Sequence, residues 1–160
     1  MFTRRTLFVA ATVAALAGCA TPTRPVPVAD AIAAQPQLTT LSSLIVKAGL
    51  TDTLNASGPF TVFAPFNQAF AKVPAQTMDA LAKDPAKLRA LLTYHVLPGK
   101  LMAADVKNGN SKTVNGASVA LSRAGDFLTV EDAVVQTPDL AATNGAVHIV
   151  DSVLMPPAGK

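Results

Sequence analysis

The sequence is poor in the residue types that most often carry chemistry. Its 160 residues include one cysteine, two histidines and no tryptophan. A single cysteine cannot form an internal disulfide, so the core alone must stabilise the fold. His95 and His148 each lie in an apolar run and not in a closely spaced ligand cluster. We therefore expect both to be hydrogen-bonded core residues, and we predict neither a metal site nor a cofactor.

Motifs of nucleophilic and phosphate chemistry are also missing. No serine lies in a Gly-x-Ser-x-Gly elbow, and no glycine-rich phosphate loop occurs. Glu131 and Asp132 are adjacent on a predicted strand end, so their carboxylates would point to opposite faces and could not work as a pair. The sequence therefore predicts a protein that is not an enzyme.

Charge is sparse and nearly balanced. Only 14% of the residues are charged and 50% are hydrophobic, which indicates a folded chain of one ordinary domain. Removal of Arg4 and Arg5 with the N-terminal segment would leave 11 of the 13 basic residues, against 10 acidic ones. No basic run is interleaved with aromatic residues, so no nucleic-acid partner is predicted.

Residues 1–18 are predicted to be an export signal. Arg4 and Arg5 precede an apolar run over residues 7–16 that is too short to span a bilayer. The run ends at Leu16-Ala17-Gly18-Cys19, which resembles the bacterial lipobox, where cleavage before the cysteine leaves it linked to diacylglycerol. We therefore predict lipidation of Cys19. The alternative is a free cysteine behind an ordinary signal peptide.

The residues around the signal bear on where the protein goes. Thr3-Arg4-Arg5-Thr6-Leu7-Phe8 resembles a twin-arginine signal, but two arginines are also a normal feature of other signals, so the export route stays open. Ala20 follows the cysteine, and resemblance to Gram-negative sorting rules favours the outer membrane in a two-membrane cell. Residues 19–27 contain three prolines and are predicted to form an extended tether. The expected location is the bacterial cell envelope.

The stretch over residues 58–74 (GPFTVFAPFNQAFAKVP) is predicted to organise the core. Its β-branched and aromatic residues predict a buried strand over residues 60–64, which ends at the proline that follows. Asn67 is then expected to cap the next helix, with Phe66 and Phe70 on one of its faces.

Helices are predicted on both sides of this strand, from apolar periodicity and from capping residues. The predicted helices are residues 29–35; residues 41–48, capped by Thr39 or Thr40 and ended by Gly49; residues 51–56; residues 78–83, capped by Thr77; and residues 85–93, begun by Asp84-Pro85.

Strands dominate the second half of the chain. An apolar run predicts a strand over residues 94–97, and from residue 111 the period becomes two. Asn115-Gly116 predicts a tight hairpin, and a turn at residues 124–126 is expected to place residues 127–130 against residues 119–122. Further strands are predicted over residues 133–137 and 146–154, with a loop between them. Helices followed by strands imply an α+β domain.

Three blocks of residues resemble the fasciclin-domain family. They are TVFAPFNQAF (residues 61–70), LLTYHVLPGK (residues 91–100) and NGAVHIVDSVLMPP (residues 144–157), and the resemblance covers residues 28–157, leaving residues 158–160 as a tail. Phe66 departs from the pattern, because the family usually has threonine or serine there. The resemblance implies a fasciclin-like β-wedge with an N-terminal helical layer.

The resemblance also implies adhesion or extracellular protein contact. In animal members, a Tyr-His segment and an Asp-Ile dipeptide are implicated in integrin contact, and the matching positions here are Tyr94-His95 and Asp139-Leu140. A bacterial lipobox gives no reason to expect an integrin. Residues 137–143 are nevertheless predicted to form a stiff exposed contact loop. The alternative is that Asp139 caps a turn and Leu140 packs in the core. Tyr94 and His95 are second-rank contact candidates, because both are expected to be core residues.

The leading functional prediction is a lipid-anchored cell-envelope protein that mediates adhesion or protein contact. Its partner is left open between a second copy, another cell-surface or envelope protein, and a glycan, with the membrane reached through the N-terminal lipid. The alternative is a periplasmic binding or scaffolding module for a small apolar ligand or an envelope polymer. A pocket lined by the phenylalanines of residues 60–70 would favour such a module.

Overall fold

The computed structural model describes residues 26–56 and 58–156. The predicted export signal, Cys19, most of the tether and the C-terminal tail lie outside these residues. The helical elements are α1 (Val28–Ala33), η1 (Pro36–Leu38), α2 (Thr39–Ala48), α3 (Thr51–Asn55), α4 (Asn67–Ala71), α5 (Ala75–Lys83), α6 (Pro85–Tyr94) and η2 (Ala103–Asp105). The strands are β1 (Phe60–Pro65), β2 (Val96–Pro98), β3 (Gly109–Lys112), β4 (Ser118–Ala124), β5 (Phe127–Val130), β6 (Ala133–Ala142) and β7 (Gly145–Val150).

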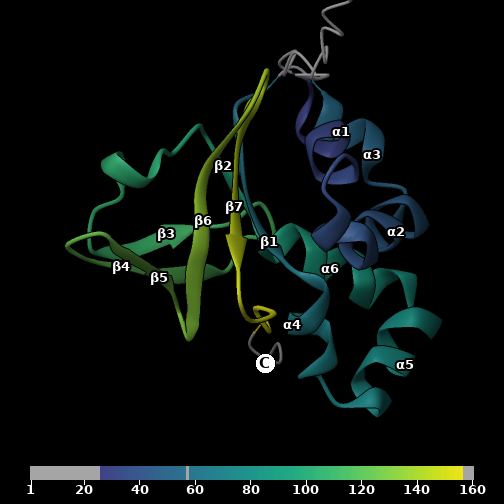
Figure 1. Cartoon of the computed structure of the whole chain (residues 1–160). Helices are drawn as coiled ribbons and strands as arrows, with labels where there is room; N and C mark the ends of the chain where they lie inside the picture. Colours follow the sequence, from purple (N-terminus) through teal and green to yellow (C-terminus); the bar gives the residue numbers. More distant parts are fainter. Residues whose placement is uncertain (1–25, 57, 157–160) are drawn as a thin grey trace, which may run out of the picture.

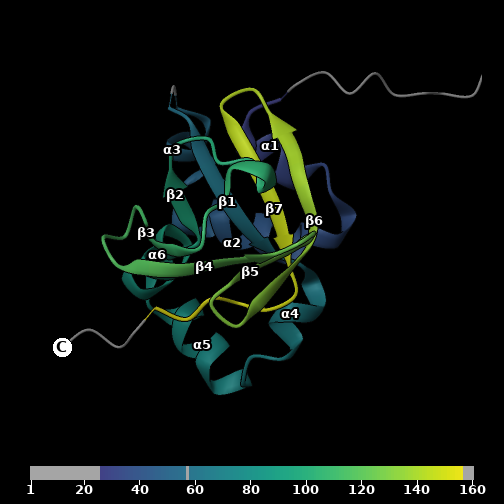
Figure 2. The ribbon, with the colours of Figure 1, turned by 90° about the vertical axis from the view of Figure 1, so that its left-hand side faces the viewer.

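The seven strands form one curled sheet with the helices on one side. Their order is β2-β1-β7-β6-β5-β4-β3, and β1 and β7 pair in parallel while all other neighbours are antiparallel. Figure 1 shows β1, β2, β6 and β7 standing between the helices and the strands β3 to β5. Figure 2 shows β4 and β5 running across the other strands. The two ends of the sheet approach each other, because Val114 N donates to Val96 O over 2.8 Å. The result is the predicted α+β wedge with a helical layer.

The central strands are buried on both faces. Val62 and Ala64 of β1 join a cluster formed with helices α1, α2, α3 and α6, whereas Phe63, between them, joins a second cluster inside the curl of the sheet. Strand residues alternate in direction, so a strand with apolar residues at successive positions is suited to lie between two cores. The predicted strand over residues 60–64 is confirmed, but its phenylalanines divide between the two clusters and their margins.

The pairing of β1 with β7 depends on one glycine. Phe60 lies opposite Gly145 in the parallel register, and a Cβ added to Gly145 would come within 1.8 Å of Phe60 O. Any side chain at this position would force the two strands apart.

Asn67 does cap a helix, but the helix is α2, which lies earlier in the chain. Its side-chain Oδ1 accepts from Thr40 N over 3.0 Å, and its Nδ2 donates to Pro36 O over 3.2 Å. No side chain caps α4 itself, where Phe66 occupies the N-cap position. The predicted caps at Thr39 or Thr40 are therefore wrong, because both residues lie inside α2 and the cap comes from another segment.

Local capping signals elsewhere gave mixed results. Asp84 caps α6 as predicted, since its Oδ1 accepts from Ala86 N and Lys87 N. The hydrogen bonds keep the Asp84 carboxylate ionised, so its pKa is lowered. Gly49 ends α2 in a left-handed conformation with φ 65°. Thr77 is not a cap, because α5 begins two residues before it, at Ala75.

Several strand predictions needed correction. Tyr94 ends α6 and His95 is its C-cap, so the predicted strand over residues 94–97 begins only at Val96. The hairpin at Asn115-Gly116 has a longer loop than predicted, since the last pair is Lys112 with Ser118. Residues 127–130 pair with residues 121–124, two positions from the predicted register. Residues 137–142, predicted as a loop, belong to the long strand β6. The strand predicted over residues 146–154 ends already at Val150.

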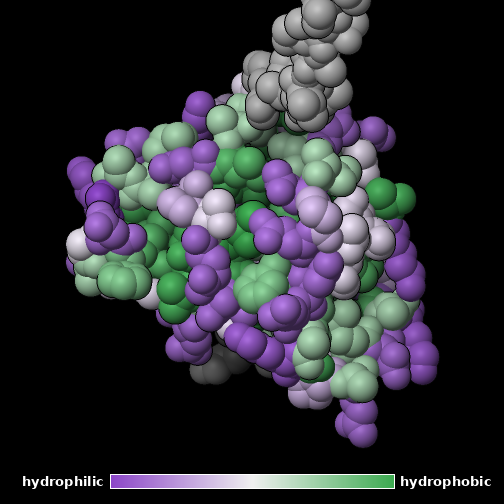
Figure 3. All heavy atoms as spheres, viewed as in Figure 1, coloured by the Kyte–Doolittle hydropathy of each residue, from purple (hydrophilic) through white to green (hydrophobic). Residues whose placement is uncertain are grey.

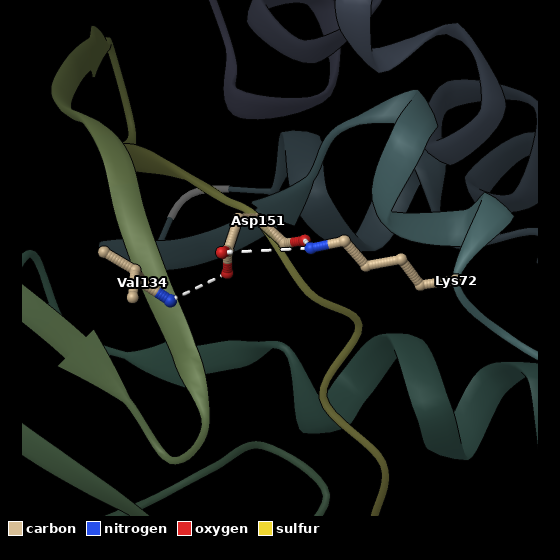
Figure 4. Close-up of polar contacts among 3 residues, drawn as sticks. All are labelled: Lys72, Val134 and Asp151. Carbon is tan, nitrogen blue, oxygen red and sulfur yellow. Dashed lines mark hydrogen bonds and ion pairs between the residues drawn. The ribbon is translucent and has the colours of Figure 1, made fainter.

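Asp151 fixes one end of β6 and β7. Its carboxylate accepts from Val134 N over 2.9 Å, as Figure 4 shows, and Lys72 Nζ reaches the Asp151 carbonyl oxygen over 3.0 Å. Lys72 is also 4.0 Å from the Asp151 carboxylate, but its side chain is largely exposed, so this ion pair adds little stability. The backbone contacts hold the start of β6 and the helix α4 against the end of β7.

Candidate functional site

The candidate contact residues on β6 lie in an irregular part of the strand. The register with β7 shifts between Val135 and Thr137 and again between Thr137 and Leu140. Within the second shift Asp139 adopts a left-handed conformation, with φ 57°. Aspartate tolerates this conformation better than most residues, but it still costs about 1 kcal/mol or more. The strand therefore presents Asp139 on a bulge that regular pairing would not form.

His148 holds this bulge from the inside. Its Nδ1 accepts from Asp139 N over 3.2 Å, and its Nε2 lies 2.8 Å from Leu101 O, to which it must donate. These partners select the neutral tautomer that carries its proton on Nε2. Burial lowers the pKa of His148, while Leu101 O and the nearby Asp139 carboxylate oppose part of this effect. The histidine is thus the internal support of the bulge.

A second set of contacts fixes Asp139 and Arg123 to η2. Asp139 Oδ1 accepts from Ala103 N over 2.7 Å. Arg123 Nη1 donates to Ala103 O over 3.1 Å and to Ala104 O over 2.8 Å, while its Nε donates to Gly125 O. The bulge of β6 and the turn between β4 and β5 are therefore joined through η2.

These contacts surround a hollow of about 490 Å³. Hydrophobic atoms gather between the strands β3 to β5 and β6 on the face shown in Figure 3. Phe127, which lines the hollow, is 72% exposed, the most exposed of the large hydrophobic side chains of the described residues. The other lining residues are Ala103, Ala104, Arg123, Asp126, Leu128, Val134, Val135, Gln136, Pro138 and Asp139.

Asp139 and Leu140 differ in what they offer to a partner. Asp139 is exposed. Leu140 is half-buried, packs against the cluster beneath the helices and pairs with Val147 of β7. The structure therefore brings together a presented carboxylate and a leucine that contributes to the core.

Tyr94 and His95 lie inside the domain and are 1% and 2% exposed. Tyr94 Oη donates to the Glu131 carboxylate. Burial is the main cause of the raised pKa of Tyr94, and the Glu131 carboxylate adds to it. His95 Nδ1 donates to Leu91 O over 2.8 Å, and its Nε2 accepts from Leu154 N over 3.0 Å. Both rings connect segments far apart in the chain, and neither reaches the surface.

His95 is neutral because of its surroundings. Burial lowers its pKa to about 4, and the hydrogen bond to Leu91 O opposes only part of this effect. A proton on Nε2 would also face the Leu154 N–H, which is itself a donor. The expectation of a hydrogen-bonded core histidine agrees with this geometry at both His95 and His148.

An apolar cavity lies between the helices and the sheet, but it is small. Its free volume is about 30 Å³, which is room for about one water molecule. Phe60 is the only phenylalanine of residues 60–70 among its lining residues. A small apolar ligand would have to displace packed side chains to enter it.

The described residues offer no other site of obvious chemistry. They contain no group of three or more His, Cys, Asp or Glu side chains placed to hold a metal ion. In the same residues, no helix has both the length and the hydropathy that crossing a membrane requires.

Comparison with known proteins identifies the family. A family model described as the fasciclin domain matches residues 36–156. The chain belongs to the fasciclin-domain family. This fasciclin domain is 44% identical over 137 residues to the immunogenic protein MPB70 of Mycobacterium bovis, with 82% of the chain and 70% of that protein covered. It is 40% identical over 137 residues to the cell surface glycolipoprotein MPB83 of the same species, with 82% and 61% covered.

A solved structure shows the same fold. The FAS1 domain pair from the insect cell adhesion molecule fasciclin I superposes with a TM-score of 0.66 at 17% identity, over 82% of this chain. The fasciclin domain described here spans about half of that chain, 51%. Neither relative named above nor fasciclin I carries a name that denotes catalysis.

Two residues of the site were missed by sequence reasoning. Phe127 begins a strand whose Leu128 and Val130 face inward, and this alternation alone would have placed the phenyl ring outside. Arg123 gave no such signal, because its carbonyl partners on η2 lie about 20 residues away along the chain.

Proposed function

We propose that this protein is a lipid-anchored component of the bacterial cell envelope whose fasciclin domain mediates adhesion by binding other proteins at the surface. The match of residues 36–156 to the fasciclin domain carries the proposal. Two names support it: a relative 40% identical is called a cell surface glycolipoprotein, and the solved chain of the same fold comes from a cell adhesion molecule.

The anchor that we propose is a lipid on Cys19. Diacylglycerol and a further acyl chain would insert at least two chains, which gives stable membrane binding where one chain is marginal. Residues 19–27, with Pro22, Pro25 and Pro27, would span about 28 Å at the roughly 3.1 Å per residue of a proline-rich linker. The domain would then stay close to the membrane, with the outer membrane favoured in a two-membrane cell.

The contact that we propose centres on Asp139. Its carboxylate is exposed, and its backbone is held by His148 and its side chain by η2. A group fixed before binding loses little conformational entropy on binding. Backbone strain is often found at functional sites, so the left-handed Asp139 favours a role beyond packing. Leu140 would contribute mainly by holding the bulge against the core.

Substitution of Cys19 tests the anchor. Cys19→Ser should move the protein from the membrane fraction to the soluble fraction, because no acyl chain can be attached. Wild-type protein found in the soluble fraction would contradict anchoring. Retention of the variant with its signal unprocessed would mean that the uncleaved segment alone holds it.

Substitution of Asp139 tests the contact. Asp139→Asn keeps an acceptor for Ala103 N and tolerates the left-handed backbone, so the melting temperature should stay within a few degrees while adhesion of cells displaying the protein falls. Asp52→Asn, at an exposed position on α3, is the matched control. Intact adhesion with Asp139→Asn would remove this bulge from the contact. Leu140→Ser should instead lower the melting temperature.

The alternative, a module that binds a small apolar ligand, receives no support from the cavity of about 30 Å³. Mass spectrometry of the purified protein distinguishes the two functions, because a copurifying small molecule would favour the alternative.

A further inference from the structure

Phe127 is exposed next to a hollow that would accept a side chain of its own kind. The ring stands at the start of β5 and is 72% exposed. Beside it lies the hollow of about 490 Å³, whose walls are partly polar and whose apolar part includes Leu128, Val135 and Pro138. A single water-exposed phenyl ring adjoining such a hollow leaves both surfaces without an apolar partner.

A surface with a projecting ring beside a hollow can be complementary to itself. In a contact between two identical molecules related by a two-fold axis, each residue that the first copy inserts is matched by the same residue of the second. Rotation about such an axis would place each Phe127 in the hollow of the other copy. The ring and the hollow lie on the same face, so one operation satisfies both.

This face carries charges of both signs, Arg123 against Asp126 and the rim residue Asp139. Arg123 lies near the end of β4 and Asp126 on the turn that follows, and within the described residues neither takes part in an ion pair. Arg123 donates instead to backbone carbonyl oxygens, which leave its net charge uncompensated. The two-fold arrangement would bring Arg123 of one copy toward Asp126 of the other. A face with charge of one sign would instead repel itself.

We propose that the face formed by Arg123, Asp126, Phe127 and the hollow binds the same face of a second copy of this protein. The inference rests on the proposed function, because it names the partner for the contact at Asp139, which lies at the rim of the same hollow. Because the face consists of a few residues around one hollow, the contact between two single molecules is expected to be weak. Many anchored copies on facing envelopes act in parallel, so weak contacts suffice for adhesion.

Photo-cross-linking in cells tests the proposal. A benzophenone-bearing phenylalanine analogue replaces Phe127 in the full-length, membrane-bound protein, and Val46, 66% exposed on α2, is replaced in the control. We expect a cross-linked band of twice the protein's mass for position 127, at least ten times stronger than for position 46. Mass spectrometry should find the analogue joined to a peptide that lines the hollow, from residues 103–104 or 128–139.

Three outcomes would overturn the proposal. A product with a different protein alone would mean that the face binds another partner. A yield no higher than at position 46 would mean that no partner occupies the hollow, and a dimer joined outside the hollow would reject the two-fold arrangement. Cell adhesion is measured in parallel with the Asp139→Asn variant. If that variant loses adhesion while the analogue at position 127 gives no cross-linked dimer, only the self-contact is rejected and the proposed adhesive function stands.

A point substitution gives an independent measurement. Phe127→Asp should reduce chemical cross-linking of the wild-type dimer at least ten-fold, whereas Val46→Asp should leave it unchanged. Both side chains are mainly exposed, so both variants should fold with a near-normal melting temperature. An undiminished dimer in Phe127→Asp would refute the role of the ring.

Discussion

Acid should destabilise this protein largely through His95, and the effect can be calculated. The histidine pKa is about 6.5 in the unfolded chain and about 4 in the folded one, where burial disfavours the charged ring. Between these pH values the His95 ring is protonated in the unfolded chain and neutral in the folded one. Unfolding therefore takes up a proton, and the free energy of unfolding falls as the pH falls. The full difference corresponds to about 3 kcal/mol, of which about 2 kcal/mol is lost by pH 5.

His95→Gln isolates this contribution, because an amide does not titrate. At neutral pH the variant should be less stable than wild type, and His95→Ala should lose about 2 to 4 kcal/mol, because it leaves a cavity and removes the acceptor of Leu154 N. Between pH 7 and pH 5, however, His95→Gln should lose about 2 kcal/mol less than wild type does. His148 and Asp84 also titrate in acid, but they are present in both proteins and cancel in the comparison.

Urea unfolding at a series of pH values measures this difference. Circular dichroism is the suitable signal, since the chain has no tryptophan. An equal loss of stability in wild type and His95→Gln between pH 7 and pH 5 would refute the reasoning. It would mean that His95 is either charged in the folded protein or solvated by local opening.

Two further predictions concern backbone geometry. Gly145→Ala should lower the free energy of unfolding by at least about 3 kcal/mol, because its Cβ would overlap Phe60 O. Gly125→Ala, which has open space around it, should lower it by only about 1 kcal/mol through left-handed strain. Thermal unfolding that ranks the two variants in the reverse order would contradict the strand register. Asn67→Ala should lower the free energy of unfolding by about 1 to 2 kcal/mol, because α2 loses its cap. Gln68→Ala, at an exposed position, is the control. Equal melting temperatures for the two variants would show that the cap is dispensable.

The sequence predicts well those structural features that depend on residues close together in the chain. Asp84 caps the helix that starts beside it, and Gly49 ends α2, because each effect depends on atoms within a few residues. The buried strand over residues 60–64 was predicted equally well, since apolar residues at successive positions suit a strand covered on both faces. The resemblance of the three blocks, which lie in or beside these elements, supplied the wedge.

The remaining features depend on partners far away in the chain. Asn67 has the right chemistry for a cap, but its position in space assigns it to a helix 27 residues earlier. Pro138 and Asp139 carry the signals of a loop, yet pairing with β7 resumes beyond them and makes the segment a bulged strand. The hollow beside Phe127 is formed by three separate segments, and no local pattern predicts how they meet.

Asn144 determines how force would pass through this molecule. Its Oδ1 accepts from Val28 N, and its Nδ2 donates to the carbonyl oxygens of Leu54 and Ala56, while Thr143 N donates to Val26 O. The start of the described chain is thereby fastened to the tip of the hairpin formed by β6 and β7, which Figure 1 shows beside α1. A pull between an N-terminal anchor and a partner at Asp139 would enter at this tip and run along β6. Both points lie on one continuous segment, residues 139–144, so its covalent backbone would carry the pull. The hydrogen bonds of Asn144 and Thr143 to the start of the chain would then bear the load before the β6–β7 ladder and before most of the helical layer.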